Sequence, residues 1–188
     1  MKKIVILLSC LVVSVASYAQ QWNVDKAHSK VGFTVTHLML SEVDGNFKNF
    51  DATITSSKED FTDAVFELSA DINSVSTDNE MRDGHLKKAD MFDAEKFPKF
   101  TFKSTSIKKT TDKKYSLVGN LTLKGVTKPV TFELTLNGIG KNMRTQKPIA
   151  GFKLSGTIKR TDFGVGGMPG AVVSEDVEIR AVGEFGKE

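Results

Sequence analysis

Few residues in this chain could carry catalytic or metal chemistry. It has three histidines, His28, His37 and His85, and a single cysteine, Cys10. No two histidines stand at the close spacing, such as that of H-E-x-x-H, which brings two imidazoles onto one metal ion. Structural zinc sites also draw on cysteine thiolates. We therefore predict hydrogen-bonded structural or cavity histidines, no metal site and no cofactor. A metal ion shared by all three histidines is the weaker alternative.

One segment concentrates charges around a histidine. It is NEMRDGHLKKADMFDAEKFPKFTF, residues 79–102, and it contains Asp83 and His85 as a candidate acid–base pair. Residues two apart on a helix do not face each other, and the chain has no G-x-S-x-G nucleophile motif. These features favour a binding protein over an enzyme, and an enzyme that acts on the same ligand is the weaker alternative.

A second unusual segment is RTDFGVGGMPGAVVSED, residues 160–176. Its glycines and its proline predict a long irregular loop. The GVGG stretch within it neither follows a clear strand nor opens a helix, so it does not match a nucleotide-binding loop.

The N-terminus has the layout of an export signal. Met1 is followed by two basic residues, Lys2 and Lys3, residues 4–15 are an almost unbroken apolar run, and a small-x-small sequence ends at Ala19. This layout predicts a secretory signal peptide over residues 1–19, which is removed on export. Cys10 lies inside the apolar run, and lipoprotein-type cleavage at LLSC is the weaker alternative.

Removal of residues 1–19 leaves 169 residues without cysteine, so no disulfide could hold them together. This length suits one domain with an ordinary hydrophobic core, which we place at residues 20–188. The formal net charge falls from +3 to +1 when the two lysines near the start are lost. Acidic and basic residues are interspersed, which disfavours nucleic acid as a partner and predicts no integral membrane insertion.

Alternation of apolar and polar residues is the main signal in the rest of the chain. Phe66, Leu68 and Ala70 share one face of a strand, for example, while Glu67 and Ser69 take the other. Strands with one apolar and one polar face are typical of antiparallel sheets, and short strands joined by turns favour a barrel or a sandwich. The expected strands are 31–36, 47–54, 66–72, 100–107, 117–123, 130–137, 152–158 and 177–181.

Turn-forming residues separate most of these strands. They are Asp44-Gly45-Asn46, Asp112-Lys113-Lys114, Gly125 and Asn137-Gly138.

The apolar face of the strands is the candidate binding surface. An eight-stranded barrel either fills its interior with side chains or holds one ligand. Small inward residues could leave space for a ligand, or they could only fit the taper of a filled barrel. The residues in question are Ala70, Gly119, Gly156, Ala181 and Gly183. The pattern alone leaves both interpretations open.

If a ligand is held, its apolar tail is expected to contact the bulky inward side chains. From strand alternation these are Phe33, Val35, Phe66, Leu68, Phe102, Leu121, Leu123, Phe132, Leu134, Phe152, Leu154 and Ile179.

Residues 79–97 are expected to form a helical cap over one end of the barrel. Thr77 and Glu80 have the spacing of a capping box, and Pro98 predicts the return to extended chain. Met81, Ala89 and Phe92 fall on one side of the helix and are expected to close the cavity. The charged residues Arg82 and His85 could meet a polar head group. The alternative is that Arg82, Asp83 and His85 only tie the cap to neighbouring backbone.

Several segments resemble the YceI family. WNVDKAHSKVGFTVTHLML, residues 22–40, has the family's opening pattern of Asp25, His28, Ser29, Phe33 and His37. NSVSTDNEMRDGHLKKADMFDAEKFPKFTFKST, residues 73–105, is similar to its most distinctive block. The matching residues of that block are Ser76, Thr77, Arg82, Asp83, His85, Leu86, Phe92, Pro98, Phe102 and Ser104. GNFKNFDATI, YSLVGNLTLKGVTKPVTF and IKRTDFGV match further segments, so the resemblance extends from Gln21 to about Phe185.

This resemblance implies an all-β fold, a lipocalin-like antiparallel eight-stranded β-barrel with a short helical cap. It also implies export to the periplasm of a Gram-negative bacterium and a long-chain polyisoprenoid or related amphiphilic lipid held inside the barrel. A carrier of fatty acids or fatty amides is the alternative that the same barrel could serve. Homodimers are a further partnership that the resemblance implies.

Overall fold

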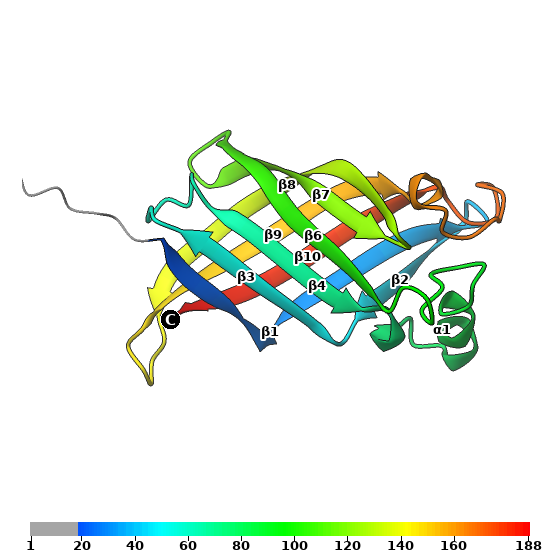
Figure 1. Ribbon diagram of the computed structural model, residues 1–188, viewed down its shortest axis with the longest axis horizontal. Coiled ribbons are helices and arrows are strands. Elements are labelled where there is room, and N and C mark those ends of the chain that lie inside the picture. Colours follow the sequence, from blue (N-terminus) through cyan, green and yellow to red (C-terminus); the bar gives the residue numbers. More distant parts are fainter. Residues whose placement is uncertain (1–18) are drawn as a thin grey trace, which may run out of the picture.

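A computed structural model describes residues 19–188, so the predicted signal peptide and Cys10 lie outside the described residues. Ten strands, one α-helix and two 3₁₀ helices are assigned in this part of the chain (Figure 1). In chain order they are β1 (Gln20–His37), β2 (Ser41–Phe47), β3 (Phe50–Ser56), β4 (Val65–Asp71), η1 (Ile72–Ser74), β5 (Val75–Ser76), α1 (Glu80–Leu86), β6 (Lys99–Lys109), β7 (Lys114–Leu123), β8 (Val126–Lys141), β9 (Pro148–Lys159), η2 (Arg160–Phe163) and β10 (Asp176–Lys187).

The strands form one closed antiparallel barrel. Neighbours along the wall are neighbours in the chain, and β10 pairs back with β1, from Trp22 opposite Lys187 to Thr34 opposite Glu178. β2 and β3 together fill a single place in the wall, because both pair with β1. β4 and β5 likewise share the next place, because β4 pairs with β3 and β5 pairs with β2. The wall therefore has eight strand positions, as predicted. Closure leaves no long unpaired edge that could template association with another sheet.

The wall departs from the predicted strands at its first hairpin. β1 begins at Gln20 rather than at Val31, and Asp44-Gly45-Asn46 lies inside β2 rather than in a turn. The glycine there serves packing, because a Cβ atom on Gly45 would lie 2.2 Å from the ring of Phe33. The turn lies instead at residues 38–40, which carry no glycine or asparagine.

Three further turn signals had mixed outcomes. The predicted turns at Asp112-Lys113-Lys114 and at Gly125 are confirmed between β6 and β7 and between β7 and β8. Asn137-Gly138 is not a turn but part of β8, where the register against β9 shifts between Leu136 and Gly138. Glycine in a strand commonly marks such a bulge.

A bulge in β1 is built by the Asp-x-x-His-Ser sequence of residues 25–29. The register with β10 shifts between Asp25 and Lys30. The Asp25 carboxylate accepts a hydrogen bond from the Ala27 N–H (2.9 Å), and the Ser29 hydroxyl accepts one from the Glu184 N–H (3.1 Å). His28 Nδ1 lies 2.9 Å from Asp25 Oδ2. These side chains replace ladder hydrogen bonds that the bulge removes.

Figure 1 shows that β1 begins and β10 ends at one end of the barrel, and aromatic side chains close this end. Phe61, from the loop between β3 and β4, is fully buried and lies edge-on to Trp22 (5.2 Å between centroids) and to Phe152 (5.0 Å). The Tyr115 hydroxyl donates a hydrogen bond of 2.7 Å to the Asp60 carbonyl. Edge-to-face packing at these distances is favourable, so this end has a solid floor.

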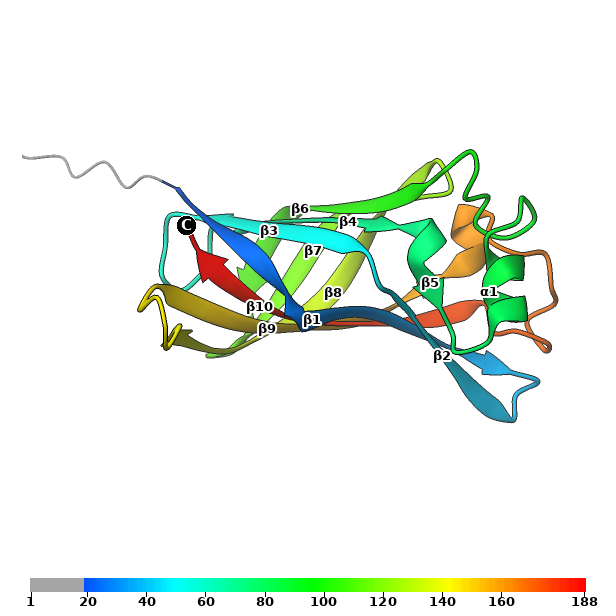
Figure 2. The ribbon, with the colours of Figure 1, turned by 90° about the horizontal axis from the view of Figure 1, so that it is seen from below.

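α1 and two long loops, residues 87–98 and 164–175, occupy the opposite end (Figure 2). The helix is shorter than the predicted cap over residues 79–97, because it ends at Leu86 and turns follow it. Its N-cap is Asn79, whose side chain accepts from the Arg82 N–H (3.0 Å), rather than Thr77. Pro98 precedes β6, as predicted.

No helix among residues 19–188 is both long and apolar enough to span a bilayer.

The loop that carries Phe61 is held by one carboxylate. Asp63 accepts hydrogen bonds from the Ser56 hydroxyl (2.6 Å), from the Ser57 N–H (3.0 Å) and from the Ser57 hydroxyl. Burial alone raises the pKa of Asp63, but these hydrogen bonds to the charged form lower it by more. The net pKa lies well below the ordinary value of 3.8.

Asp63→Asn should lower the free energy of unfolding at pH 7 by roughly 1–2 kcal/mol, because it weakens several of these hydrogen bonds. A carboxyl group with a lowered pKa stabilises the fold above its unfolded value of 3.8 and loses this effect as the pH falls. The difference in free energy of unfolding between the variant and the native protein should therefore shrink as the pH falls from about 5 to about 2. Urea denaturation at several pH values measures this difference. Asp112→Asn, in an exposed turn, is the control, and a difference that stays constant with pH would contradict this assignment.

Candidate functional site

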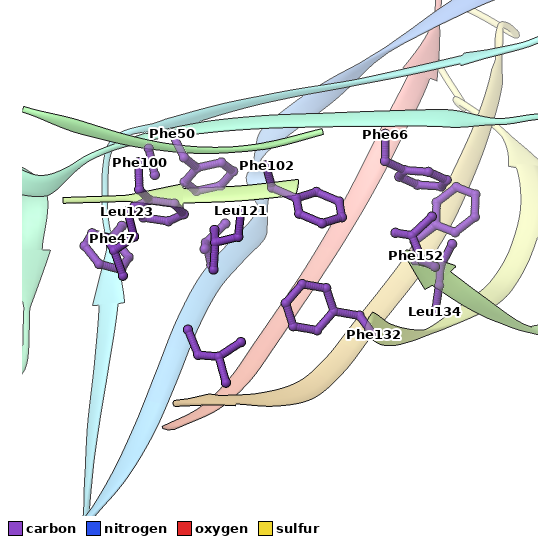
Figure 3. Close-up of a cluster of buried hydrophobic side chains, with 14 of the residues drawn as sticks. Phe47, Phe50, Phe66, Phe100, Phe102, Leu121, Leu123, Phe132, Leu134 and Phe152 are labelled. Carbon is purple, nitrogen blue, oxygen red and sulfur yellow. The ribbon is translucent and has the colours of Figure 1, made fainter. Parts of the chain in front are cut away.

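A cavity of about 620 Å³ lies inside the barrel. Figure 3 shows Phe47 at one end of a row of inward side chains, Phe66 and Phe152 at the other, and Phe102 and Phe132 between them. All five of these residues line the cavity. Phe61 and Trp22 of the aromatic floor do not, so the cavity ends at the layer of Phe66 and Phe152. The barrel is hollow towards α1 and filled beneath this layer.

The predicted tail residues all line this cavity, and so do Met81, Arg82, His85 and Phe92 of the predicted cap, whereas Ala89 does not. Strand alternation therefore located its wall. It missed residues where the alternation is irregular, as around the break between β2 and β3, and residues of the loops, which carry no periodic signal. The missed lining residues include Phe47, Phe50, Phe100, Met91, Met168 and Val173.

Glycines determine where the aromatic rings lie. A Cβ atom on Gly119 would lie 2.4 Å from the Phe102 ring, and one on Gly156 would lie 2.6 Å from the Phe132 ring. The rings therefore rest against glycine backbone in the wall, as aromatic side chains do when they cover glycines in sheets. The hypothesis that small inward residues leave space directly is wrong at these two positions, because rings occupy that space. The glycines help to keep the cavity open by letting the rings lie back against the wall.

The other small inward residues differ among themselves. At Gly183 a Cβ atom would lie 2.8 Å from the Phe185 ring, which repeats the arrangement of ring on glycine. Ala70 is buried among core side chains and does not line the cavity, whereas Ala181 does. Ala181 and Gly183 are therefore the small inward residues that line the cavity.

α1 is tied to the barrel through Thr77. The Thr77 N–H and hydroxyl donate to Asp83 Oδ1 at 2.8 and 2.6 Å, and Arg82 donates from Nε and Nη2 to the Thr77 hydroxyl and carbonyl, each at 2.7 Å. Asp83, and the Nε and Nη2 atoms of Arg82, therefore tie the cap to neighbouring backbone, as the alternative interpretation states. Within residues 19–188, the second terminal nitrogen of Arg82, Nη1, has no hydrogen-bond partner. Since Arg82 also lines the cavity, Nη1 could bind a ligand's head group.

Asp83 and His85 do not form an acid–base pair. Asp83 binds Thr77, whereas His85 Nε2 lies 3.0 Å from Asp90 Oδ2. The hydrogen bond from His85 lowers the pKa of Asp90. Each group of the proposed pair is therefore engaged by a different partner.

The apolar side of the predicted cap is not formed as expected. Met81 is 87% exposed and Ala89 is also exposed, so neither closes the cavity. The reason is that α1 ends at Leu86, and the helical spacing that would align these residues with Phe92 ends with it. Phe92 does cover the mouth, and its ring centroid lies 6.1 Å from that of Phe47.

Arg160 organises the loop of residues 164–175, and sequence reasoning missed it. Its side chain is 94% buried, and all five of its N–H donors are directed at carbonyl oxygens rather than at a carboxylate. The acceptors are Ser174 (3.0 Å) for Nε, Val165 (3.0 Å) and Gly166 (2.9 Å) for Nη1, and Met168 (2.6 Å) and Val173 (3.0 Å) for Nη2. This single guanidinium group shapes the loop into one side of the cavity mouth.

Lys124 links the two loops at the mouth. Its ammonium group donates to the carbonyls of Ala89 and Gly164, each at 2.9 Å. The Gly166 N–H adds a hydrogen bond of 3.1 Å to the Asp90 carbonyl. The mouth is therefore a bridged rim rather than two independent loops.

The three-histidine metal site is wrong for the described residues. The one cluster of three potential ligands within residues 19–188 is Asp25, His28 and Glu184, which contains a single histidine. Its Asp25–His28 hydrogen bond raises the pKa of His28 and lowers that of Asp25. This pair belongs to the β1 bulge, on the barrel wall. His37 and His85 line the cavity instead, and His85 contacts Asp90 there rather than a shared ion.

Comparisons with known proteins agree with this geometry. The family model described as YceI-like domain matches residues 22–185. UPF0312 protein SA2479 of Staphylococcus aureus (strain N315) is 36% identical over 166 residues, which cover 86% of this chain and 94% of that protein.

Solved structures are similar over most of their length. The crystal structure of Burkholderia cenocepacia BcnA aligns with a TM-score of 0.78 and 27% identity, over 86% of this chain and 98% of that one. A polyisoprenoid binding domain from Saccharophagus degradans, implicated in plant cell wall breakdown, aligns with a TM-score of 0.67 over 89% of this chain and 98% of that one. At 15% identity, this second likeness shows a shared fold.

Arg160→Lys should destabilise the mouth although it keeps the charge, because an ammonium group has three donors and no planar fork. We expect a loss of roughly 2–4 kcal/mol in the free energy of unfolding, since several buried carbonyls lose their partners. Chemical denaturation measures the loss, and hydrogen exchange localises it to residues 164–175. Arg180→Lys, at an exposed position of β10, is the control. Native exchange rates in that loop of the Arg160 variant would contradict the role of Arg160.

Proposed function

The chain belongs to the YceI-like domain family, and from that membership and its cavity we propose that it binds a long-chain isoprenoid-type lipid inside the barrel. The observation that carries this proposal is the apolar cavity of about 620 Å³, which has an aromatic floor and one mouth beside α1. The likeness to a polyisoprenoid binding domain supports it at the level of fold.

The energetics of such binding need only apolar contact. Burial contributes about 0.8 kcal/mol per methylene, so a five-carbon isoprene unit could gain at most about 4 kcal/mol before ordering costs. Micromolar affinity corresponds to about −8 kcal/mol. A few buried units would therefore suffice, and no charged groove is required.

The distribution of charge gives the bound lipid a direction. Arg82, His85 and Arg160 line the cavity from α1 and η2, at the mouth. Glu67 also reaches the lining, but its carboxylate is paired with Lys103 at 2.8 Å. We therefore place the tail on the floor at Phe152 and the polar head group at the mouth.

The predicted signal peptide over residues 1–19 extends this proposal to location and role. It supports a mature domain of residues 20–188 that acts as a periplasmic carrier or scavenger of its lipid. Binding without turnover is favoured because Asp83 and His85 have separate partners. Turnover that is abolished by His85→Ala would favour the enzyme alternative.

Mass spectrometry of an organic extract of protein purified from the native host tests the proposal. We expect isoprenoid-type lipid in near-stoichiometric amount. Ala181→Phe should remove most of it, because Ala181 lines the cavity and the added ring would occupy part of it. Arg180→Phe puts the same ring at an exposed position of β10 and should retain the lipid. Fatty acids or fatty amides in the extract would identify the ligand as one of these instead of an isoprenoid. Equal amounts of lipid extracted from the Ala181 and Arg180 variants would contradict binding in the cavity.

Arg82→Ala should weaken binding of an acidic, dansyl-labelled isoprenoid about tenfold, because a hydrogen bond to a charged group is worth roughly 1.5–3 kcal/mol. Fluorescence titration measures the affinity, and circular dichroism checks folding. Asp83→Ala is the matched control, since it breaks the same Thr77 tether and leaves the guanidinium group in place. Unchanged affinity in the Arg82 variant would remove the head-group role.

A further inference from the structure

The turn between β1 and β2 exposes apolar side chains in a conformation that does not favour them. Leu38, Met39 and Leu40 are 48%, 75% and 85% exposed. Leu38 and Met39 have φ values of 52° and 55°, and the Leu40 N–H donates to the His37 carbonyl at 3.0 Å, which makes a type I′ turn. Such turns favour Asn and Gly, because both central residues are left-handed. The requirements of the turn therefore do not explain Leu38 and Met39.

This turn belongs to the mouth of the cavity. The Leu38 N–H donates to the Val172 carbonyl at 2.9 Å, and His37 pairs with Val173. His37 and Val173 both line the cavity, so the apolar tip begins where the lining ends. Figure 2 shows the β1–β2 hairpin projecting at the end of the barrel that also carries α1.

Two more exposed methionines lie at the same mouth. Met81 on α1 is 87% exposed and Met168 in the loop of residues 164–175 is 38% exposed, and both line the cavity. We call these two residues and the three of the turn the apolar rim. Clusters of exposed apolar side chains commonly mark contact surfaces.

We propose that the apolar rim inserts into the surface of a lipid bilayer, which lets a lipid tail pass between the bilayer and the cavity without crossing water. This proposal rests on the proposed function only for the identity of the lipid that enters the cavity. Docking of the apolar rim can be tested without any bound ligand.

The size and shape of the rim favour a bilayer over a second copy of the chain. Its five side chains are each smaller than the largest aromatic ones, and at their exposed fractions they could bury about 700 Å² together. A stable dimer needs roughly 800 Å² per partner, with complementary packing. The rim side chains project from three separate elements, which suits a deformable lipid surface better than a matched protein face.

The contact should depend on insertion and not on charge. Residues 20–188 have a formal net charge of +1, and the charged residues beside the rim are of both signs, such as Glu80, Arg82, Lys87 and Asp90. Salt weakens attraction between exposed charges but does not weaken apolar insertion. Binding to neutral vesicles at high salt is therefore the distinguishing property.

Flotation with neutral phosphatidylcholine vesicles in a density gradient, at low and at high salt, tests the proposal. The native protein should float at both. The double variant Leu38→Asn with Met39→Gly should lose about tenfold or more of its vesicle affinity, because burial of one such side chain is worth about a factor of ten. Its Tm should be unchanged or higher, since Asn-Gly suits the turn. Met143→Gln is the matched control, because Met143 is 95% exposed in the turn between β8 and β9, at the far end of the barrel.

The outcomes separate this proposal from the proposed function. Native protein that stays with the vesicle-free fraction, or a double variant that floats as the native protein does, overturns bilayer docking. The native protein could instead form a dimer, detected by light scattering, that the double variant loses, while the native protein does not float. That result assigns the apolar rim to a contact with a second copy of the chain and also overturns bilayer docking. A dansyl-labelled isoprenoid in vesicle-free solution should bind the native protein and the double variant equally. Flotation without any probe binding would leave docking intact and refute the cavity as a lipid site.

Discussion

The packing of aromatic rings on glycine backbone decides whether this barrel is hollow. An eight-stranded barrel encloses an interior that side chains can just fill, and several bulky phenylalanines point into this one. Phe102 and Phe132 avoid filling it because Gly119 and Gly156 leave room for the rings against the wall. A side chain at either glycine would push a ring towards the axis. The cavity of about 620 Å³, and any role as a lipid carrier, depends on this arrangement.

The two ends of the barrel then give the cavity its direction. At one end Phe61, Trp22 and Phe152 form a floor of edge-to-face rings. At the other end the Arg160 guanidinium group gathers five carbonyl oxygens and holds the loop of residues 164–175 as a rim. A buried cation without a carboxylate partner near the mouth, and apolar side chains further in, match an amphiphile that enters tail first. Beyond the mouth, the exposed apolar tip of the first hairpin extends from the cavity lining at His37. It would contact the lipid surface from which a ligand enters.

Much of this arrangement could be predicted from the sequence, because alternation in strands is a local signal. It located the eight wall positions and the bulky residues of the cavity. It failed where a tertiary contact overrides local chemistry. The residue pattern predicts a turn at Gly45, which instead accommodates the Phe33 ring. It also predicts a helical cap that extends to residue 97, but the helix ends at Leu86. Arg160 could not be found from the sequence, because its acceptors are carbonyl oxygens of a loop whose path no residue pattern reveals.

The most direct test of the account is a crystal structure of the protein with an isoprenoid that carries bromine at the end of its tail. Anomalous scattering should place the bromine against the floor, beside Phe66, Phe152 and Phe185, with the head group near Arg82 at the mouth. A bromine beside Met81 and Met168 would reverse the direction of binding. Rings of Phe102 and Phe132 turned across the barrel axis, with no bromine inside, would show that side chains fill the interior and would contradict the account.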